Sequence, residues 1–354
     1  ILFEKIIGEN NLKLKYVIIF SICSAYLLSI RIAGSLIFLQ YLITFIIFLN
    51  IYKISFIKFL TNYYKHFLIF IIFLVFFIFL FYPILWINPL LLIQTFEINA
   101  AHFNNVGTTT LGEIMYSKDL PSTYLLIWFS VKLPLIILLG ILILPFTEKK
   151  IFKDKKKGVF FGTLLLSVSS ILLILIFKKV HLYDEIRQVM FLVPLIFIIG
   201  LTSLFNLSKK FFYLIVPITV LFFIGENIKI NPYQYVWFNL PSRVLDLNKN
   251  FELEYQGISG REISKHLNTL KTQELCILAN PMWSVKTFLN NSKFNCFDTW
   301  QKIETNYKRP FLAVQNVRNL KRSMPYKCNL IYETGFTFFF HQEKIVTGKL
   351  LKCE

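Results

Sequence analysis

Long stretches of the chain are almost uninterrupted by polar residues, and lysine clusters stand between many of them. A bilayer core of about 30 Å is crossed by a helix of roughly 20 apolar residues. Seven runs approach that length, and none shows the strict alternation of a barrel strand. They are approximately Tyr16–Ile30, Ser35–Ile51, His66–Trp86, Tyr124–Phe146, Val159–Phe177, Val189–Phe205 and Phe211–Ile228. The pattern predicts a polytopic α-helical membrane protein with about seven transmembrane helices.

Lysines occupy every second connection between the runs, and this orients the chain. They precede the first run, separate the second from the third, fill the link between the fourth and fifth, and lie between the sixth and seventh. Short cytoplasmic loops carry the excess of lysine and arginine. The remaining connections, including the long loop 86–123, and everything after Ile228 are therefore expected to face outward.

The tail 229–354 is more polar than the transmembrane region 1–228, so we expect a domain boundary between them. Short β-type runs occur at 275–279, 311–314 and 329–332. The segment Ser259–Leu270 reads as a helix in which Ser259 is the N-cap and Glu262 completes a capping box. Strands alternating with helices predict a small C-terminal α/β extracytoplasmic domain.

Composition supports the membrane class and excludes two others. Hydrophobic residues make up 55% of the 354 residues and charged residues 16%, with mean hydropathy +0.58. A soluble domain has about 25% charged residues, and a disordered chain would be far less apolar. Lysines in the inward loops account for much of the net charge of +18, so no nucleic-acid partner is expected.

Four of the five cysteines fall in the exported tail, and none has the spacing of a metal site. An oxidising compartment permits two disulfides among Cys276, Cys296, Cys328 and Cys353, in any of three connectivities. Four free, buried thiols are the alternative.

Three cations are predicted near the outer leaflet: Arg31, Lys132 and Arg187. A charge inside a bilayer costs about 2.5–3.5 kcal/mol, so it is a functional candidate. Together they suit a lipid-linked phosphate, because arginine gives paired contacts and lysine a point charge. Alternatively, Lys132 and Arg187 reach the headgroups and Arg187 pairs with Asp184.

The long outer loop and its edge carry further candidates for chemistry. Glu97 and His102 could act as a base or as metal ligands, although a solvated amphipathic helix explains the pattern equally well. Glu113 and Tyr124 complete the set of acceptor candidates. No phosphate-binding glycine loop, serine-hydrolase elbow or zinc-protease motif is present in the sequence.

Three stretches together resemble one family. They are Leu111–Pro121 with Tyr124, Trp128, Lys132 and Pro134; Tyr183–Arg187 leading into Phe191–Pro194; and Asn231–Asn239 followed by Phe251–Ser259. They are similar to stretches of bacterial polytopic GT-C-type glycosyltransferases related to protein O-mannosyltransferases and the lipid A aminoarabinose transferase. The third stretch is the most specific, and the resemblance covers roughly residues 31–259.

The resemblance implies an enzyme of the bacterial inner membrane that builds the cell envelope. It would move a hexose or pentose from a polyprenyl-phosphate donor to a lipid, glycan or protein acceptor at the outer face. Arg31, Lys132 and Arg187 would bind the lipid phosphate. Glu97, His102, Glu113 and Tyr124 would order the acceptor, with a divalent cation as an optional cofactor and no certain metal ligand.

Two departures from the family limit this expectation. Family members carry an acidic general base in the first outer loop, which would lie upstream of Ile1, so we interpret the chain as a fragment truncated at its N-terminus. In the tail, Asn231 replaces a common histidine, and Glu254-Tyr-Gln256 replaces Asp-Tyr-Trp. Alternatives are a flippase or transporter for a lipid-linked solute, an O-antigen-ligase-type transferase, and a non-catalytic subunit whose exported domain binds a partner.

Overall fold

The computed structural model describes residues 12–30, 32–91, 93–94, 105–270, 275–290, 294, 296–299, 310–316, 327–341 and 343–354. The chain divides into two compact units, each assembled from separate segments. Unit 1 consists of residues 1–105, 139–181 and 189–209, and unit 2 of residues 106–138, 182–188 and 210–354.

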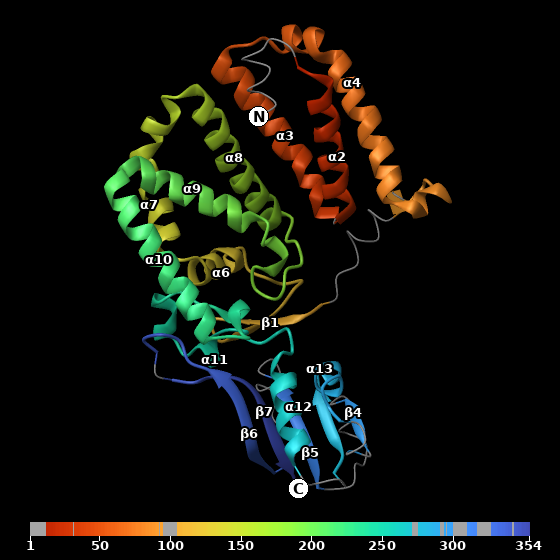
Figure 1. Cartoon of the computed structure of the whole chain (residues 1–354), viewed down its shortest axis with the longest axis vertical. Helices are drawn as coiled ribbons and strands as arrows, with labels where there is room; N and C mark the ends of the chain where they lie inside the picture. Colours follow the sequence, from red (N-terminus) through yellow and green to blue (C-terminus); the bar gives the residue numbers. More distant parts are fainter. Residues whose placement is uncertain are drawn as a thin grey trace. The chain divides into compact units, whose positions relative to one another are not determined.

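Each of the seven apolar runs is helical over most of its length (Figure 1). The helices are α2 (Leu14–Ile30), α3 (Leu36–Tyr52), α4 (Phe56–Phe81), α6 (Tyr124–Lys132), α7 (Leu135–Phe152), α8 (Lys155–Phe177), α9 (Leu192–Leu207) and α10 (Lys209–Lys229). Short 3-10 turns are η1 (Ile32–Ser35), η2 (Pro83–Trp86), η3 (Arg187–Val189), η4 (Gln234–Val236) and η5 (Pro241–Val244).

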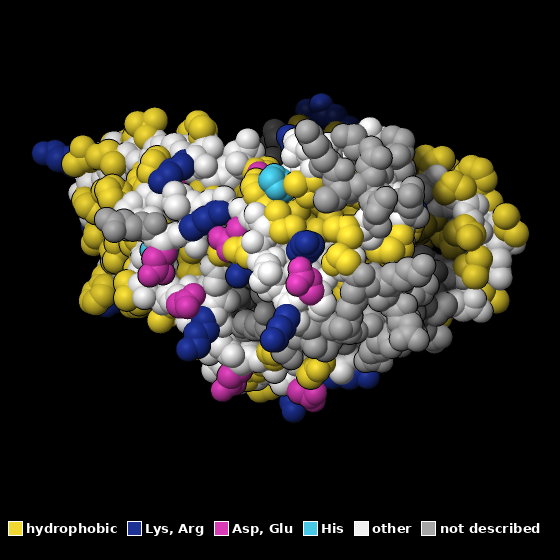
Figure 2. Space-filling view, turned by 90° about the horizontal axis from the view of Figure 1, so that it is seen from below, with side chains coloured by type: hydrophobic (Ala, Val, Ile, Leu, Met, Phe, Trp, Pro, Cys, Tyr) yellow, Lys and Arg dark blue, Asp and Glu magenta, His cyan; other side chains and the backbone are white. Residues whose placement is uncertain are grey.

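Helix length and apolarity fit an integral membrane protein. Among the described residues, α4, α8 and α10 are long and apolar enough to cross a bilayer, and the bent pair α6–α7 adds a fourth span if counted as one. The apolar helices α2, α3 and α9 are shorter, at 10–17 residues. Seven spans therefore remain a prediction. Figure 2 shows hydrophobic side chains over wide parts of one surface, which is typical of a lipid-facing protein.

The fourth apolar run was expected as one helix, and this expectation is wrong. Helix α6 ends at Lys132, α7 begins at Leu135, and their axes differ by 117°. Pro134 lies between them. A proline has no N–H to donate and disfavours helical geometry in the residue before it. Leu133 is accordingly extended, with φ −78° and ψ 140°.

Within unit 1, glycines allow backbones to approach closely at two points. A Cβ at Gly34 would lie 2.3 Å from the carbonyl oxygen of Leu27, so the tight connection between α2 and α3 requires glycine there. A Cβ at Gly140 in α7 would lie 2.2 Å from the carbonyl oxygen of Gly200 in α9. Such small residues permit close helix packing in membranes.

The C-terminal part of unit 2 contains a five-stranded sheet with strand order β4-β3-β5-β7-β6. The strands are β3 (Ile277–Asn280), β4 (Phe297–Thr299), β5 (Phe311–Asn316), β6 (Cys328–Phe336) and β7 (Ile345–Cys353). Strand β3 pairs in parallel with β4 and β5, whereas β7 pairs antiparallel with β5 and β6. A separate hairpin joins β1 (Gly107–Thr110) to β2 (Glu113–Tyr116).

Helix α12 (Ser259–Thr269) and the short α13 (Met282–Lys286) pack on one face of this sheet. Ile263 and Leu267 of α12 enter a core with Ile277, Val314 and Leu350 from three strands. The sheet with its helices is the small α/β domain expected from the sequence. The predicted capping box is wrong, because Ser259 is the first helical residue and its hydroxyl donates to Glu254 at 3.0 Å.

Two disulfides join the tail cysteines as Cys276–Cys296 and Cys328–Cys353. This is one of the three connectivities that the sequence left open. Cys328 and Cys353 are register partners on β6 and β7. Cys23 of α2 is free and exposed.

The boundary between the two compact units differs from the domain boundary that we expected after residue 228. Unit 2 includes the tail but also residues 106–138 and the connection 182–188. Backbone pairing explains some of this grouping: the N–H of Glu252 donates to the carbonyl of Thr109 at 3.0 Å, and Gly112 donates to Asn250 at 2.9 Å. The second half of the long loop thus folds with the tail.

Candidate functional site

Three segments that are distant in the sequence meet inside unit 2 around the side chain of Lys132. Lys132 is the last residue of α6, and its ammonium lies 2.7 Å from Oε2 of Glu185 in the connection before η3. The ammonium also donates to the carbonyl of Tyr235 at 3.3 Å. It lies 4.1 Å from the ring centroid of Phe238, close enough for a cation–π contact.

The Lys132–Glu185 pair is removed from solvent. The two side chains are 6% and 3% exposed. Such burial makes ions expensive unless they are paired. The second oxygen of Glu185, Oε1, is buried without a hydrogen-bond partner among the described residues. The pair therefore leaves one acceptor position of Glu185 available.

The backbone that presents Glu185 is strained. Asp184 and Glu185 both lie in the left-handed region, with φ 56° and φ 64°. Non-glycine residues in this region cost of order 1–3 kcal/mol and are concentrated at functional sites. Two consecutive residues in this conformation turn both acidic side chains inward, where each is 3% exposed as a whole residue.

Burial raises the pKa of Glu185 from 4.5 to about 7. Desolvation is the largest cause, and Lys132 opposes it by favouring the charged form. The negative charges of Glu252 and Asp184 add to the rise. A carboxyl that titrates near neutral pH can take up and release a proton under physiological conditions.

Arg187 lies at the solvent side of this cluster. Its Nη1 lies 3.1 Å from Oδ2 of Asp184, and its side chain is 50% exposed. The guanidinium carbon is 5.8 Å from the ring centroid of Tyr255. Because an arginine has five N–H donors, the contact with Asp184 leaves other donors for a second anion.

A second buried carboxylate, that of Glu254, accepts hydrogen bonds from several parts of the tail. Glu254 is fully buried and accepts hydrogen bonds from the Tyr235 hydroxyl at 2.7 Å and the Ile258 N–H at 2.6 Å. Ser259 completes its set of donors. Burial raises the pKa of Glu254, while these hydrogen bonds oppose the rise. Glu254 thereby fixes Tyr235, whose carbonyl accepts from Lys132.

Asn239 holds the break between α6 and α7 in place. Its side-chain amide donates to the carbonyl of Ser130 at 2.6 Å and to that of Leu133 at 2.9 Å. Its backbone N–H donates to Val131 at 2.9 Å. These are carbonyls that a continuing helix would have satisfied. The end of α6, and with it Lys132, is thus fixed by the tail.

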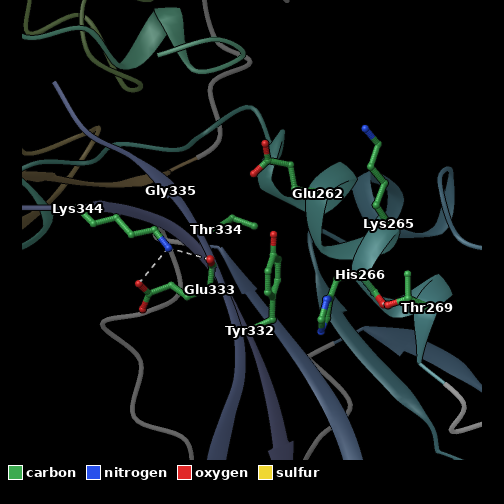
Figure 3. A pocket seen from close by; sticks show the side chains of 9 residues that line it. All are labelled: Glu262, Lys265, His266, Thr269, Tyr332, Glu333, Thr334, Gly335 and Lys344. Carbon is green, nitrogen blue, oxygen red and sulfur yellow. Dashed lines mark hydrogen bonds and ion pairs between the residues drawn. The ribbon is translucent and has the colours of Figure 1, made fainter. Parts of the chain in front are cut away.

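A separate open hollow of about 720 Å³ lies between α12 and β6, and Lys344 from the connection before β7 also lines it (Figure 3). In Figure 3 the carboxylate of Glu262 and the hydroxyl of Tyr332 face the same space. The Tyr332 ring stacks on His266 with centroids 4.2 Å apart. Lys344 donates to the carbonyl of Glu333 at 2.9 Å. The lining combines an aromatic ring with charges of both signs, which suits a polar, neutral ligand.

The structure brings together only some of the predicted site residues. Lys132 and Arg187 belong to the cluster, and Tyr124 lies close enough to Glu185 that, besides burial, the negative charge of this carboxylate raises the pKa of its phenol. Glu113 is exposed on β2. Arg31, Glu97 and His102 lie outside the described residues.

Sequence reasoning did not select Glu185 or Glu252 as site residues. One sequence signal was available, because both glutamates lie beside apolar segments. Burying a carboxylate costs free energy unless it is paired, so a carboxylate in such a position is a candidate for a functional role. Aspartate adopts the left-handed region occasionally, but glutamate is not favoured there, so the sequence does not signal two consecutive left-handed residues at Asp184 and Glu185.

Among the residues that the structure describes, no three His, Cys, Asp or Glu side chains form a group that could hold a metal ion. The chain matches no known protein family and no solved structure. It is 31% identical over 58 residues to the large ribosomal subunit protein uL23c of Euglena longa, a match that covers 16% of this chain and 59% of that protein. This partial match assigns no family and does not bear on sugar transfer.

Proposed function

We propose that this chain belongs to a membrane glycosyltransferase that uses a polyprenyl-phosphate sugar donor. The convergence of the resembling stretches carries the proposal. Lys132 from the first stretch contacts both Glu185 from the second and Tyr235 from the third. Motifs that are about fifty residues apart in the sequence are thus joined in one polar site.

Arg187 is the cation best placed to bind the lipid phosphate, because its guanidinium is half exposed and retains free donors. Lys132 has a different role from the one expected from sequence. Its ammonium is already engaged by Glu185, so it positions that carboxylate and supplies positive charge behind it. Phosphate binding by Arg31 remains a prediction.

The reaction would be a displacement at the anomeric carbon. The acceptor hydroxyl loses its proton to a carboxylate base and its oxygen bonds to the sugar. The bond between the anomeric carbon and the phosphate oxygen breaks, and the polyprenyl phosphate leaves with the electron pair. Arg187 would stabilise the negative charge that develops on this leaving group. The resemblance implies an acidic residue of the family's first outer loop as that base.

The hollow at Tyr332 is the proposed site for a hydroxyl-bearing acceptor. Oε2 of Glu262 accepts a hydrogen bond from the Tyr233 hydroxyl at 2.8 Å. Oε1 would then accept a hydrogen bond from a hydroxyl of the ligand. The remaining finer expectations belong to the same proposal: seven spans, a bacterial inner membrane, and a tail on the outer side.

The test is transfer of a radiolabelled hexose from a polyprenyl-phosphate donor in membranes that contain the full-length protein. We expect Arg187→Ala to reduce transfer about 100-fold or more, as for the loss of one charge-stabilising donor. Lys178→Ala, at an exposed lysine after α8, is the matched control. Tyr332→Ala should raise the KM for the acceptor and leave donor binding unchanged.

Three outcomes would contradict the proposal. Normal transfer by Arg187→Ala would remove its phosphate role. Donor binding without transfer by the unmodified protein would indicate a non-catalytic subunit. Movement of the intact donor across a sealed bilayer would indicate a transporter.

A further inference from the structure

The turn between β6 and β7 carries three consecutive phenylalanines, and it packs beside helix α10. We call Phe338, Phe339 and Phe340 the aromatic turn. Phe339 and Phe340 have ring centroids 6.0 Å and 6.2 Å from that of Phe222 in α10. Lys229, the last residue of α10, donates to the carbonyl of Phe338 at 3.0 Å.

A buried carboxylate locks this turn to the helix. Glu226 of α10 is fully buried and accepts the backbone N–H of Phe339 at 3.3 Å. The same carboxylate receives both terminal nitrogens of Arg243, at 2.5 Å and 2.7 Å, and the indole N–H of Trp237 at 2.6 Å. The guanidinium of Arg243 also stacks over Phe338 at 4.0 Å. These contacts fix the position of the aromatic turn along the axis of α10.

The aromatic turn contacts α10 at Phe222, within the apolar part of the helix. Phe222 precedes Glu226 by four residues, which is about one helical turn or 5.4 Å. It precedes Lys229 by seven residues, or about 10 Å along the axis. Because α10 is one of the helices long and apolar enough to cross a bilayer, a side chain level with Phe222 lies below the membrane surface.

Phe340 has almost no protein covering. The residue is 88% exposed, and its backbone lies in the left-handed region at φ 57°. Of the 21 residues of α10, all of them described, Glu226 alone is buried. The turn thus extends the uncovered apolar face of a candidate membrane span.

We propose that the aromatic turn inserts into the lipid bilayer and anchors the C-terminal domain to the membrane on the side where α10 ends. The occupant of this surface is lipid, because the turn continues a helix face whose length and composition suit hydrocarbon. Transfer of a phenylalanine side chain from water to an apolar medium is favourable, so insertion removes the exposed ring from water. The inference does not depend on the reaction that the protein catalyses.

Spin labelling tests the depth of the turn. The full chain carries Phe340→Cys in a Cys23→Ser background, which leaves the label as the sole free thiol because the other four cysteines form disulfides. It is reconstituted in phosphatidylethanolamine–phosphatidylglycerol vesicles. We expect dissolved oxygen to relax the label more strongly than a water-soluble nickel chelate does.

Leu330→Cys is the control on the same hairpin. Leu330 is 54% exposed and precedes Phe336 by six strand residues, about 20 Å. Its label should favour the nickel chelate. If the labels at 340 and 330 respond alike to the chelate, the turn lies in water and the proposal fails. A label at 340 shielded from both reagents would indicate a covering protein and would equally overturn it.

A second variant covers the case in which the cysteine disturbs the turn. Phe340→Trp keeps an aromatic side chain, and its fluorescence is measured against the unmodified protein in vesicles of brominated lipid. We expect the added emission to be quenched by bromine on the upper acyl chain. An added emission that is insensitive to brominated lipid contradicts insertion.

Discussion

The ammonium of Lys132 and the carboxylate of Glu185 lie 2.7 Å apart, although 53 residues separate them in the sequence and both are almost fully buried. Neither charge has access to bulk water. Each therefore depends on the other for its ionised state, and the pair links α6 to the connection that precedes η3.

Removing one member of this pair should be costly. At pH 8 we expect Lys132→Met to destabilise the protein by about 3–5 kcal/mol, because it leaves a buried carboxylate unpaired. The double variant Lys132→Met/Glu185→Gln should regain most of that loss. Thermal unfolding in detergent, followed by tryptophan fluorescence, measures both. Lys149→Met, at an exposed lysine of α7, serves as the control. Equal losses in the single and double variants would show that the two charges are not coupled.

The carboxyl of Glu185 should titrate close to neutral pH. Its pKa in the folded protein is about 7, above the ordinary value of 4.5, because burial disfavours the charged form. The native state therefore holds this proton more tightly than the unfolded state does, and the group's contribution to stability falls as pH rises from 4.5 to 7.

Infrared spectroscopy can observe this proton directly. We expect a protonated-carboxyl band that disappears with a midpoint near pH 7 and is absent in Glu185→Gln. The same substitution should flatten the pH dependence of the melting temperature in this range. A band that is already lost by about pH 5 would contradict the raised pKa.

Asn239→Ala should loosen the break between α6 and α7. The substitution leaves the carbonyls of Ser130 and Leu133 without their donor, which costs about 1–3 kcal/mol where such groups are buried. Asn227→Ala is matched, because that amide makes one hydrogen bond to Phe223 within its own helix. Similar melting temperatures for the two variants would show that Asn239 does not support the break.

Each disulfide should stabilise the C-terminal domain on its own. The bonded cysteines are 20 and 25 residues apart, and closing loops of this length contributes about 3 kcal/mol each in the chain-entropy model. Proteolytic peptides separated without reductant should contain the pairs Cys276–Cys296 and Cys328–Cys353. Recovery of Cys276 linked to Cys328 would contradict the fold of the sheet.

Much of the helical architecture could be predicted from the sequence, because a run of apolar residues is a strong local signal. The helix at Ser259 and the strands at Ile277, Phe311 and Cys328 were also visible from patterning. Pro134 was a sequence signal for the break between α6 and α7. The length of the apolar run around it nevertheless favoured one continuous helix.

The polar contacts between distant segments were beyond sequence reasoning, because they depend on tertiary structure. Glu226 and Arg243 read as ordinary charges at a helix end and in a loop, yet they form a buried pair. Asp184 reads as the partner of Arg187, which it is. Glu185 beside it reaches Lys132 from a backbone with two consecutive left-handed residues, which the sequence does not signal.

The place of β7 in the sheet constrains the order in which the C-terminal domain can assemble. Strand β7 follows all the other strands in the sequence, yet it lies between β5 and β6. During synthesis, β5 and β6 must therefore wait with unpaired edges until β7 emerges. Such edges invite association between chains. Chaperones that shield nascent strands should thus improve the yield of the folded protein.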